Sequence, residues 1–310
     1  MKKFLRNILV FCLPIIVLMV CLEVAVSAIP NSYTYKSNYI KNNGNNIEAL
    51  AIGHSQLYDG FNPEKFSVPS FNFCNSSQEY IEDYYLLEKF LPYMPNLKVV
   101  ILPIGYMNVT SKDCDTTLTE RSCYYHKYMS LNYSGRLPLT YYFECLMPFK
   151  ALTKAEAYYR YHEDMVRCDS LGRRNEHSKR RNDYKLGDDN VLKVYTCDEH
   201  DIRKLCVKYD YYLKLIISEL TKRNIKVVLV SPPYFWDYGF EGINQEQRTY
   251  LRYYMDNLCK NYPVSYLNLE SDTTYEYDDF FDESHLDDCG ADKFTKSINE
   301  FVFNLAYNRE

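Results

Sequence analysis

The sequence predicts an α/β domain built on a parallel sheet of about five strands. Short apolar, β-branched runs of strand length recur along the chain, and segments with helical spacing stand between them. Polar residues directly follow several of these runs. Strands that alternate with helices are typical of a parallel sheet. Five strands with flanking helices favour a flavodoxin-like three-layer α/β/α sandwich, whose sites lie at the carboxyl ends of the strands.

The first half of the sheet is predicted from residues 47–103. Residues 47–52 form a buried strand, and residues 70–74 form a short one. The run "LKVVILP" at 97–103 is strongly apolar and β-branched, which indicates a central parallel strand. A helix is expected between the last two strands, because four apolar or aromatic residues stand there at helical spacing: Ile81, Tyr84, Leu87 and Leu91.

The second half follows after a long interval. A helix is marked by Leu213, Ile216, Ile217 and Leu220. The strand "IKVVLVSPP" (225–233), a Tyr-rich helix around 245–260 and the strand "VSYLNL" (264–269) come next. The chain closes with a helix that carries Phe294, Ile298, Phe301 and Leu305 on one face.

Residues 109–206 interrupt this alternation of strands and helices and are predicted to be an insertion. Residues 141–166 read as helix, and "GRRNEHSKRR" at 172–181 is a charge run. The run is most simply a solvated loop; alternatively it is a basic lip that attracts an acidic glycan. Because the insertion falls between two core strands on the active edge of the sheet, we expect it to be a lid or substrate-binding segment.

The N-terminus predicts a membrane segment. Basic residues precede the apolar run 8–22, and Glu23 is followed by apolar residues 24–29. We expect residues 1–30 to be a cytoplasmic tip and transmembrane anchor; alternatively "AVSA" at 25–28 marks a cleaved signal peptide. Residues 31–46, which end in "KNNGNN", are predicted to be a polar linker. In both cases the domain at 47–310 is extracytoplasmic.

Composition limits the function classes. A chain of 310 residues, 46% of them hydrophobic, can bury a full core, and a net charge of −5 argues against a nucleic-acid partner. The 33 tyrosines would suit a carbohydrate-binding surface; alternatively, they reflect only the amino-acid usage of the source organism.

The chain has 11 cysteines, two of them in the N-terminal apolar segment. The remaining odd number leaves at least one unpaired within the chain in an oxidising compartment. Two pairings are plausible: Cys114 with Cys123, and Cys168 with Cys197. No Cys or His spacing suggests zinc, so we expect neither a metal nor a cofactor.

Two strand ends carry candidate chemistry. In "ALAIGHSQLYDGFNP" (49–63), Ser55 leaves the core directly after the first strand, and "DDFFDESHLDDCGADKFT" (278–295) places Asp282 three residues before His285. Ser55 is a candidate nucleophile, His285 its base and Asp282 the acid that orients the imidazole. Alternatively, Ser55 is an ordinary polar residue at a strand end, and Asp282 and His285 are ordinary surface residues. His54 is expected to pack the turn or contact substrate.

These two segments resemble the first and last blocks of the SGNH (GDSL-type) hydrolase superfamily. Gly53-His54-Ser55 stands where that superfamily has Gly-Asp-Ser, and Asp282 and His285 match its Asp-x-x-His. The segment 71–90, "FNFCNSSQEYIEDYYLLEKF", is similar to the second block. The resemblance covers about 47–105 and 207–305 and leaves the insertion unmatched.

The resemblance implies a catalytic triad of Ser55, His285 and Asp282. It also implies an oxyanion hole made by the Ser55 backbone N–H and a donor from the second block, where Asn75 and Ser77 stand. In "PIGYMN" (103–108), Asn108 lies one position after the place of the third-block asparagine.

The function implied is that of a membrane-anchored, extracytoplasmic serine esterase or O-acyltransferase acting on an envelope polysaccharide or acylated sugar. Anchored members of the superfamily partner a membrane-bound O-acyltransferase in alginate acetylation or teichoic-acid D-alanylation. The alternative is an inactive SGNH-like envelope protein that binds a glycan or such a partner.

Overall fold

The computed structural model describes the chain except residues 1, 106–120, 133–141, 176–206, 236–244 and 308–310. It divides into two compact units. The first unit combines residues 1–38 with 118–167, and the second combines residues 39–117 with 168–310.

The second unit contains a five-stranded parallel sheet in the order β2-β1-β3-β4-β5. This order is that of a flavodoxin-like sheet, so the predicted fold class is confirmed. All five strands fall within the predicted segments: β1 (Ala49–Ala51), β2 (Ser70–Asn72), β3 (Val99–Pro103), β4 (Lys226–Ser231) and β5 (Val264–Asn268).

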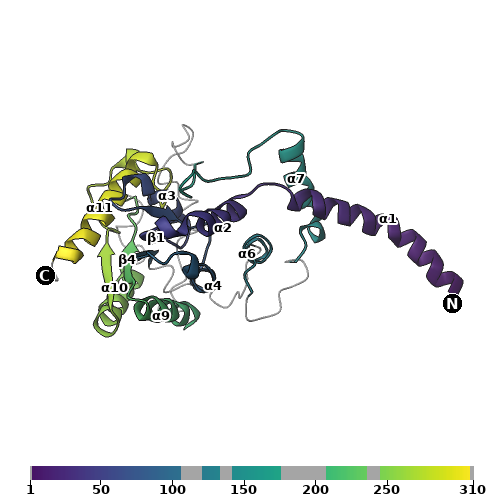
Figure 1. Ribbon diagram of the computed structural model, residues 1–310. Coiled ribbons are helices and arrows are strands. Elements are labelled where there is room, and N and C mark those ends of the chain that lie inside the picture. The colour runs from purple at the N-terminus through teal and green to yellow at the C-terminus, as the bar shows by residue number, and fades with distance from the viewer. Residues whose placement is uncertain (1, 106–120, 133–141, 176–206, 236–244, 308–310) are drawn as a thin grey trace. The chain divides into compact units, whose positions relative to one another are not determined.

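Helices cover both faces of this sheet (Figure 1). On one face lie α4 (Tyr80–Phe90), α9 (Val207–Lys222) and α10 (Gln245–Asn261). On the other face α3 (Ser55–Gly60) contacts α11 (Asp288–Tyr307). Short 3₁₀ turns complete the unit: η1 (Gly44–Asn46), η2 (Pro63–Lys65), η3 (Leu91–Tyr93) and η9 (Tyr277–Asp279).

The core of the second unit lies where the central strands meet these helices. β3 is buried along its whole length, and β1 is buried on both sides. Leu50 of β1 pairs with Phe71 on one side and Val100 on the other. A strand buried on both faces explains the continuous apolar runs in the sequence.

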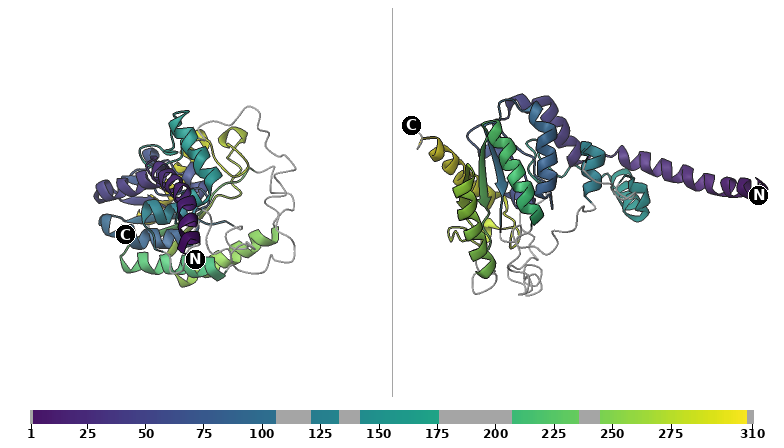
Figure 2. Two further views of the ribbon diagram at one scale, coloured as in Figure 1. Left: turned by 90° about the vertical axis from the view of Figure 1, so that its right-hand side faces the viewer. Right: turned by 90° about the horizontal axis from the view of Figure 1, so that it is seen from below.

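The first unit is helical. It contains α1 (Lys2–Ser27), the start of α2 (Ser32–Asn43), α6 (Ser122–Met129), η6 (Glu144–Leu146) and α7 (Pro148–Tyr159). Figure 2 shows α1 as one long helix. Its residues Arg6–Ser27 are long and apolar enough to cross a membrane. The end of α1 packs on α7, where Val26, Ile29 and Ala151 are buried together.

A partly buried ionic network ties Glu23 of α1 to the rest of the first unit. Lys127 Nζ lies 2.5 Å from Glu23 Oε1 and 3.0 Å from Glu144 Oε1. Lys154 Nζ lies 2.9 Å from the other oxygen of Glu144, and the backbone N–H of Cys145 donates to Glu23 Oε2 at 2.9 Å. The apolar segment can contain Glu23 because its carboxylate pairs with Lys127 and with the Cys145 N–H. No local sequence pattern predicts these contacts.

Three predicted segments differ in the structure. The expected linker 31–46 contains α2 and η1, because Ile40 and Gly44 are buried. The helix expected over 141–166 ends at Tyr159, and His162 adopts a left-handed φ of 56° shortly after it. The expected insertion is divided, since 118–167 belongs to the first unit and 168–175 to the second.

Candidate active site

The turn after β1 presents Ser55 at the carboxyl end of the sheet. Gly53 has φ +139°, and a Cβ there would lie 2.3 Å from the Pro103 side chain. Only glycine fits this approach. His54 then caps α3 in an extended conformation, and Ser55 is the first residue of that helix. The Ser55 side chain is therefore fixed by a strand-to-helix turn rather than by a free loop.

The loop between β5 and α11 holds the other two candidate residues. Asp282 Oδ1 accepts the backbone N–H groups of Ser284 and His285, each at 2.9 Å. The Phe281 N–H donates to the His285 carbonyl at 2.8 Å, and a bridge between Phe280 and Leu286 closes the turn. This compact turn points both side chains to the same side.

The three side chains meet in one hydrogen-bonded row. His285 Nε2 lies 2.8 Å from Ser55 Oγ, and His285 Nδ1 lies 2.8 Å from both carboxylate oxygens of Asp282. An ionised carboxylate only accepts, so Nδ1–H donates to Asp282 and Nε2 is left to accept the Ser55 hydroxyl proton. This is the arrangement of nucleophile, base and orienting acid.

The electrostatics of the row favour a charged pair. Burial lowers the pKa of His285, but the hydrogen bond and charge of Asp282 and the charge of Asp59 outweigh it, so the pKa lies above its ordinary value. Burial raises the pKa of Asp282, yet its bonds to His285 and Ser284 bring it below the ordinary value. A protonated His285 side chain is thus stabilised in this position by the two acids.

The predicted oxyanion residues follow β2. The backbone N–H of Asn75 donates to the Gly53 carbonyl at 3.1 Å, and its side-chain amide donates to Gln78 at 2.8 Å. Gln78 in turn donates to buried Asp83 at 2.7 Å. Ser77 is exposed and has a left-handed φ of 51°. These hydrogen bonds hold Asn75 in place beside the turn that carries Ser55. Asn108 lies outside the described residues.

Two amide side chains that hold the site were not predicted. Asn72 ends β2 and donates to the carbonyls of Leu57 and Phe61, each at 2.9 Å, which holds the C-terminal part of α3. Gln56 donates to the Ser284 carbonyl at 3.2 Å and joins the nucleophile turn to the His285 loop. An asparagine inside an apolar strand is the signal that could have identified Asn72.

The start of the predicted charge run is packed, which corrects the expectation of a solvated loop. Asn72 N–H donates to the Leu171 carbonyl at 2.9 Å, so residues 168–174 dock on the edge strand β2. A Cβ on Gly172 would lie 2.2 Å from the Asn72 carbonyl oxygen. Arg173 and Arg174 have side chains only 9% exposed, because both pair with acids of the second unit. Residues 176–181 lie outside the described residues.

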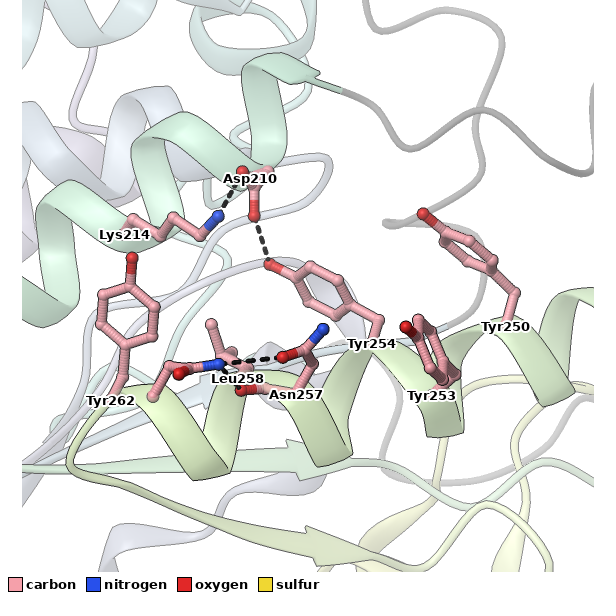
Figure 3. Close-up of a pocket in the computed structure, with 9 residues that line it drawn as sticks. Asp210, Lys214, Tyr250, Tyr253, Tyr254, Asn257, Leu258 and Tyr262 are labelled. Carbon is pink, nitrogen blue, oxygen red and sulfur yellow. Dashed lines mark hydrogen bonds and ion pairs between the residues drawn. The ribbon is translucent and has the colours of Figure 1, made fainter.

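A groove of about 600 Å³ lies between α9 and α10 (Figure 3). Tyr254 Oη donates to Asp210 Oδ1 at 2.9 Å, and Lys214 lies 2.7 Å from the other oxygen. Tyr250 and Tyr253 stand along the same wall. The remaining lining residues are Asn257, Leu258, Asn261 and Tyr262. Since Asp210 is already paired, the groove offers mainly aromatic and amide surface, and it shares no residue with the row Ser55–His285–Asp282.

His126 of α6 lies outside the row and contacts the Leu131 carbonyl at 2.9 Å within the first unit. Cys114 and Cys197 lie outside the described residues, so the two proposed cysteine pairings stay predictions. Within the described residues, no group of three or more His, Cys, Asp or Glu side chains could hold a metal ion.

One of the comparisons with known proteins matches part of this chain. A family described as "DltD protein" matches residues 206–303, less than a third of the chain, which includes Asp282 and His285. No curated protein matches the chain. A solved structure from Streptococcus pneumonia, described as a candidate platelet activating factor, aligns over 97% of both chains with 10% identity and a TM-score of 0.39. A likeness of that size carries no argument about function.

Proposed function

We propose that this protein is a membrane-anchored, extracytoplasmic serine O-acyl esterase or O-acyltransferase of the SGNH type that acts on a cell-envelope polysaccharide. The observation that carries the proposal is the row Ser55–His285–Asp282, with 2.8 Å at each contact. The match to DltD over 206–303 supports an envelope substrate, because that family acts in the D-alanylation of teichoic acids.

The reaction follows from the row. Ser55 Oγ attacks the carbonyl carbon of an acyl ester while His285 Nε2 takes its proton. The tetrahedral intermediate collapses, the ester C–O bond breaks, and His285 returns the proton to the leaving alcohol. A hydroxyl of water or of a sugar, deprotonated by His285, then attacks the acyl-Ser55 carbonyl and releases the serine. Hydrolysis and transfer differ only in this acceptor.

The packing of α1 supports a retained anchor over a cleaved signal peptide. Within the alternative cleavage segment 25–28, Val26 is fully buried in the core of the first unit, although Ser27 and Ala28 are exposed. Tyr159 Oη donates to the Ala25 carbonyl at 2.9 Å. Loss of α1 would therefore remove part of that core. An anchor would hold the enzyme beside a membrane-bound O-acyltransferase partner. This arrangement favours acyl transfer to a sugar over hydrolysis.

A serine-directed fluorophosphonate probe tests the proposal on the full-length protein in detergent. We expect labelling of the wild type, none of Ser55→Ala, and labelling of His285→Ala slowed by about 10⁴-fold. Asp282→Asn misorients the imidazole without removing it, so its effect should be smaller. The thermal midpoint of Ser55→Ala should stay close to that of the wild type. A folded wild type that takes up no probe would refute the enzyme and favour a non-catalytic binding protein.

A further inference from the structure

A second carboxylate lies beside the catalytic base. Asp59 stands one turn after Ser55 in α3, and its side chain is fully buried. Asp59 Oδ2 lies 3.9 Å from His285 Nε2, the nitrogen that faces Ser55 Oγ at 2.8 Å. The imidazole is therefore flanked by Asp282 on Nδ1 and by Asp59 on Nε2. A carboxylate on the Nε2 side competes with the serine for that nitrogen and stabilises the protonated, inactive base.

Arg174 occupies the other side of Asp59. Its Nε lies 3.1 Å from Asp59 Oδ1, and its guanidinium stacks over the Tyr58 ring at 4.7 Å. The same guanidinium donates to the Ser76 hydroxyl, in the segment expected to help form the oxyanion hole. The backbone N–H of Arg174 donates to the Tyr58 carbonyl at 3.1 Å. The Arg174 side chain thus joins α3, which carries Ser55, to the segment that follows β2.

The turn that carries Arg174 is built to hold it there. Asp169 Oδ1 accepts the N–H groups of Leu171 and Arg173, each at 2.9 Å, and Cys168 bridges Arg174 across the turn. Arg173 Nε donates to the Asp59 carbonyl at 2.8 Å, and its terminal nitrogen lies 2.6 Å from Asp288. Arg173 therefore fixes the turn to the backbone of Asp59, and Arg174 fixes it to the side chain of Asp59.

We propose that Arg174 is a positioning residue for the base: by pairing with Asp59, it keeps that carboxylate from capturing His285 Nε2 and leaves this nitrogen aligned on the Ser55 hydroxyl. This inference rests on the proposed function. In the part of the chain that the structure describes, the charged groups with the largest effect on the imidazole are Asp282 from its own loop, Asp59 from α3 and Arg174 from the docked turn. Asp59 raises the pKa of His285 and Arg174 lowers it, in line with the geometry.

The test is the pH dependence of fluorophosphonate labelling in the full-length protein. Without the guanidinium, the unopposed Asp59 charge favours the imidazolium, so the acid limb of Arg174→Gln should move to higher pH. We expect its labelling at pH 6.5 to fall about tenfold while labelling at pH 9 stays close to that of the wild type. Arg174→Lys keeps the charge and should restore most of the wild-type profile.

The double variant Asp59→Asn/Arg174→Gln removes both charges, and its acid limb should return toward that of the wild type. Arg223→Gln, which breaks an exposed pair with Glu219 on α9, is the matched control and should leave the profile unchanged. A merely structural role for Arg174 would lower labelling equally at every pH, and the double variant would then show no return. That result would overturn the inference.

Acylation of His285 by diethyl pyrocarbonate, followed by mass spectrometry, separates this inference from the proposed function. The reagent attacks the neutral imidazole and needs no catalytic serine. In a Ser55→Ala background, Arg174→Gln should still move the midpoint of His285 modification to higher pH. Absent probe labelling with this shift intact would refute the enzyme alone. An unmoved midpoint would refute the role of Arg174 even in an active protein.

Discussion

Asn72→Ala should weaken the second unit at the point where its edge strand holds the nucleophile helix. The Asn72 side chain is fully buried at the end of β2. Its amide donates to the carbonyls of Leu57 and Phe61 at 2.9 Å each, and its oxygen accepts the Cys74 N–H at 3.1 Å. Alanine removes these three short hydrogen bonds and a longer one, to the Tyr58 carbonyl at 3.3 Å, and leaves buried backbone groups to find other partners.

The expected cost follows from these bonds. Three buried hydrogen bonds at about 1 kcal/mol each make about 3 kcal/mol of unfolding free energy. The Leu57 carbonyl keeps a second donor, the Phe61 N–H at 3.0 Å, which holds the cost near that sum. In a unit of this size each kcal/mol lowers Tm by about 3 °C, so we expect a loss of about 9 °C.

Thermal unfolding of the full-length protein, followed by circular dichroism, measures this loss. Asn261→Ala is the matched control, because Asn261 is exposed and bonds only within α10, to Asn257. It should change Tm by no more than about 1 °C. If Asn72→Ala melted with the control, the clamp on α3 would not stabilise the fold, and the reasoning from buried amides would be wrong.

Three further outcomes are expected. The labelling rate of the wild type should fall as the pH drops through the raised pKa of His285, since only the neutral imidazole accepts the serine proton; a flat profile from pH 5 to 8 would contradict the assigned base. Glu144→Gln leaves Lys154 without its buried countercharge, so the first unit should lose about 3 kcal/mol, seen as faster amide hydrogen exchange in α6 and α7; unchanged exchange would show that the network is dispensable. Tyr254→Phe deletes the hydrogen bond to Asp210 and should cost about 1 kcal/mol in thermal unfolding without slowing labelling, whereas slowed labelling would link the groove to the active site.

Local pattern determined most of the sheet and the candidate row. The apolar runs at 97–103 and 225–233 could be assigned as strands because continuous β-branched runs of this length are typical of parallel strands covered on both faces. Ser55 and His285 could be paired from sequence because parallel topology brings all strand carboxyl ends to one edge. The structure then places their side chains 2.8 Å apart.

Only the tertiary structure decided what surrounds that row. Arg174 looked like part of a solvated charge run, since two adjacent arginines after a glycine carry no local sign of burial. No local pattern marks Asp59 as a buried residue. Their contact at 3.1 Å joins positions more than 100 residues apart, and the same holds for Glu23 and Lys127 in the first unit. A buried charge is stable only beside its partner, and the partner is chosen by the fold of the whole chain rather than by the spacing of its neighbours.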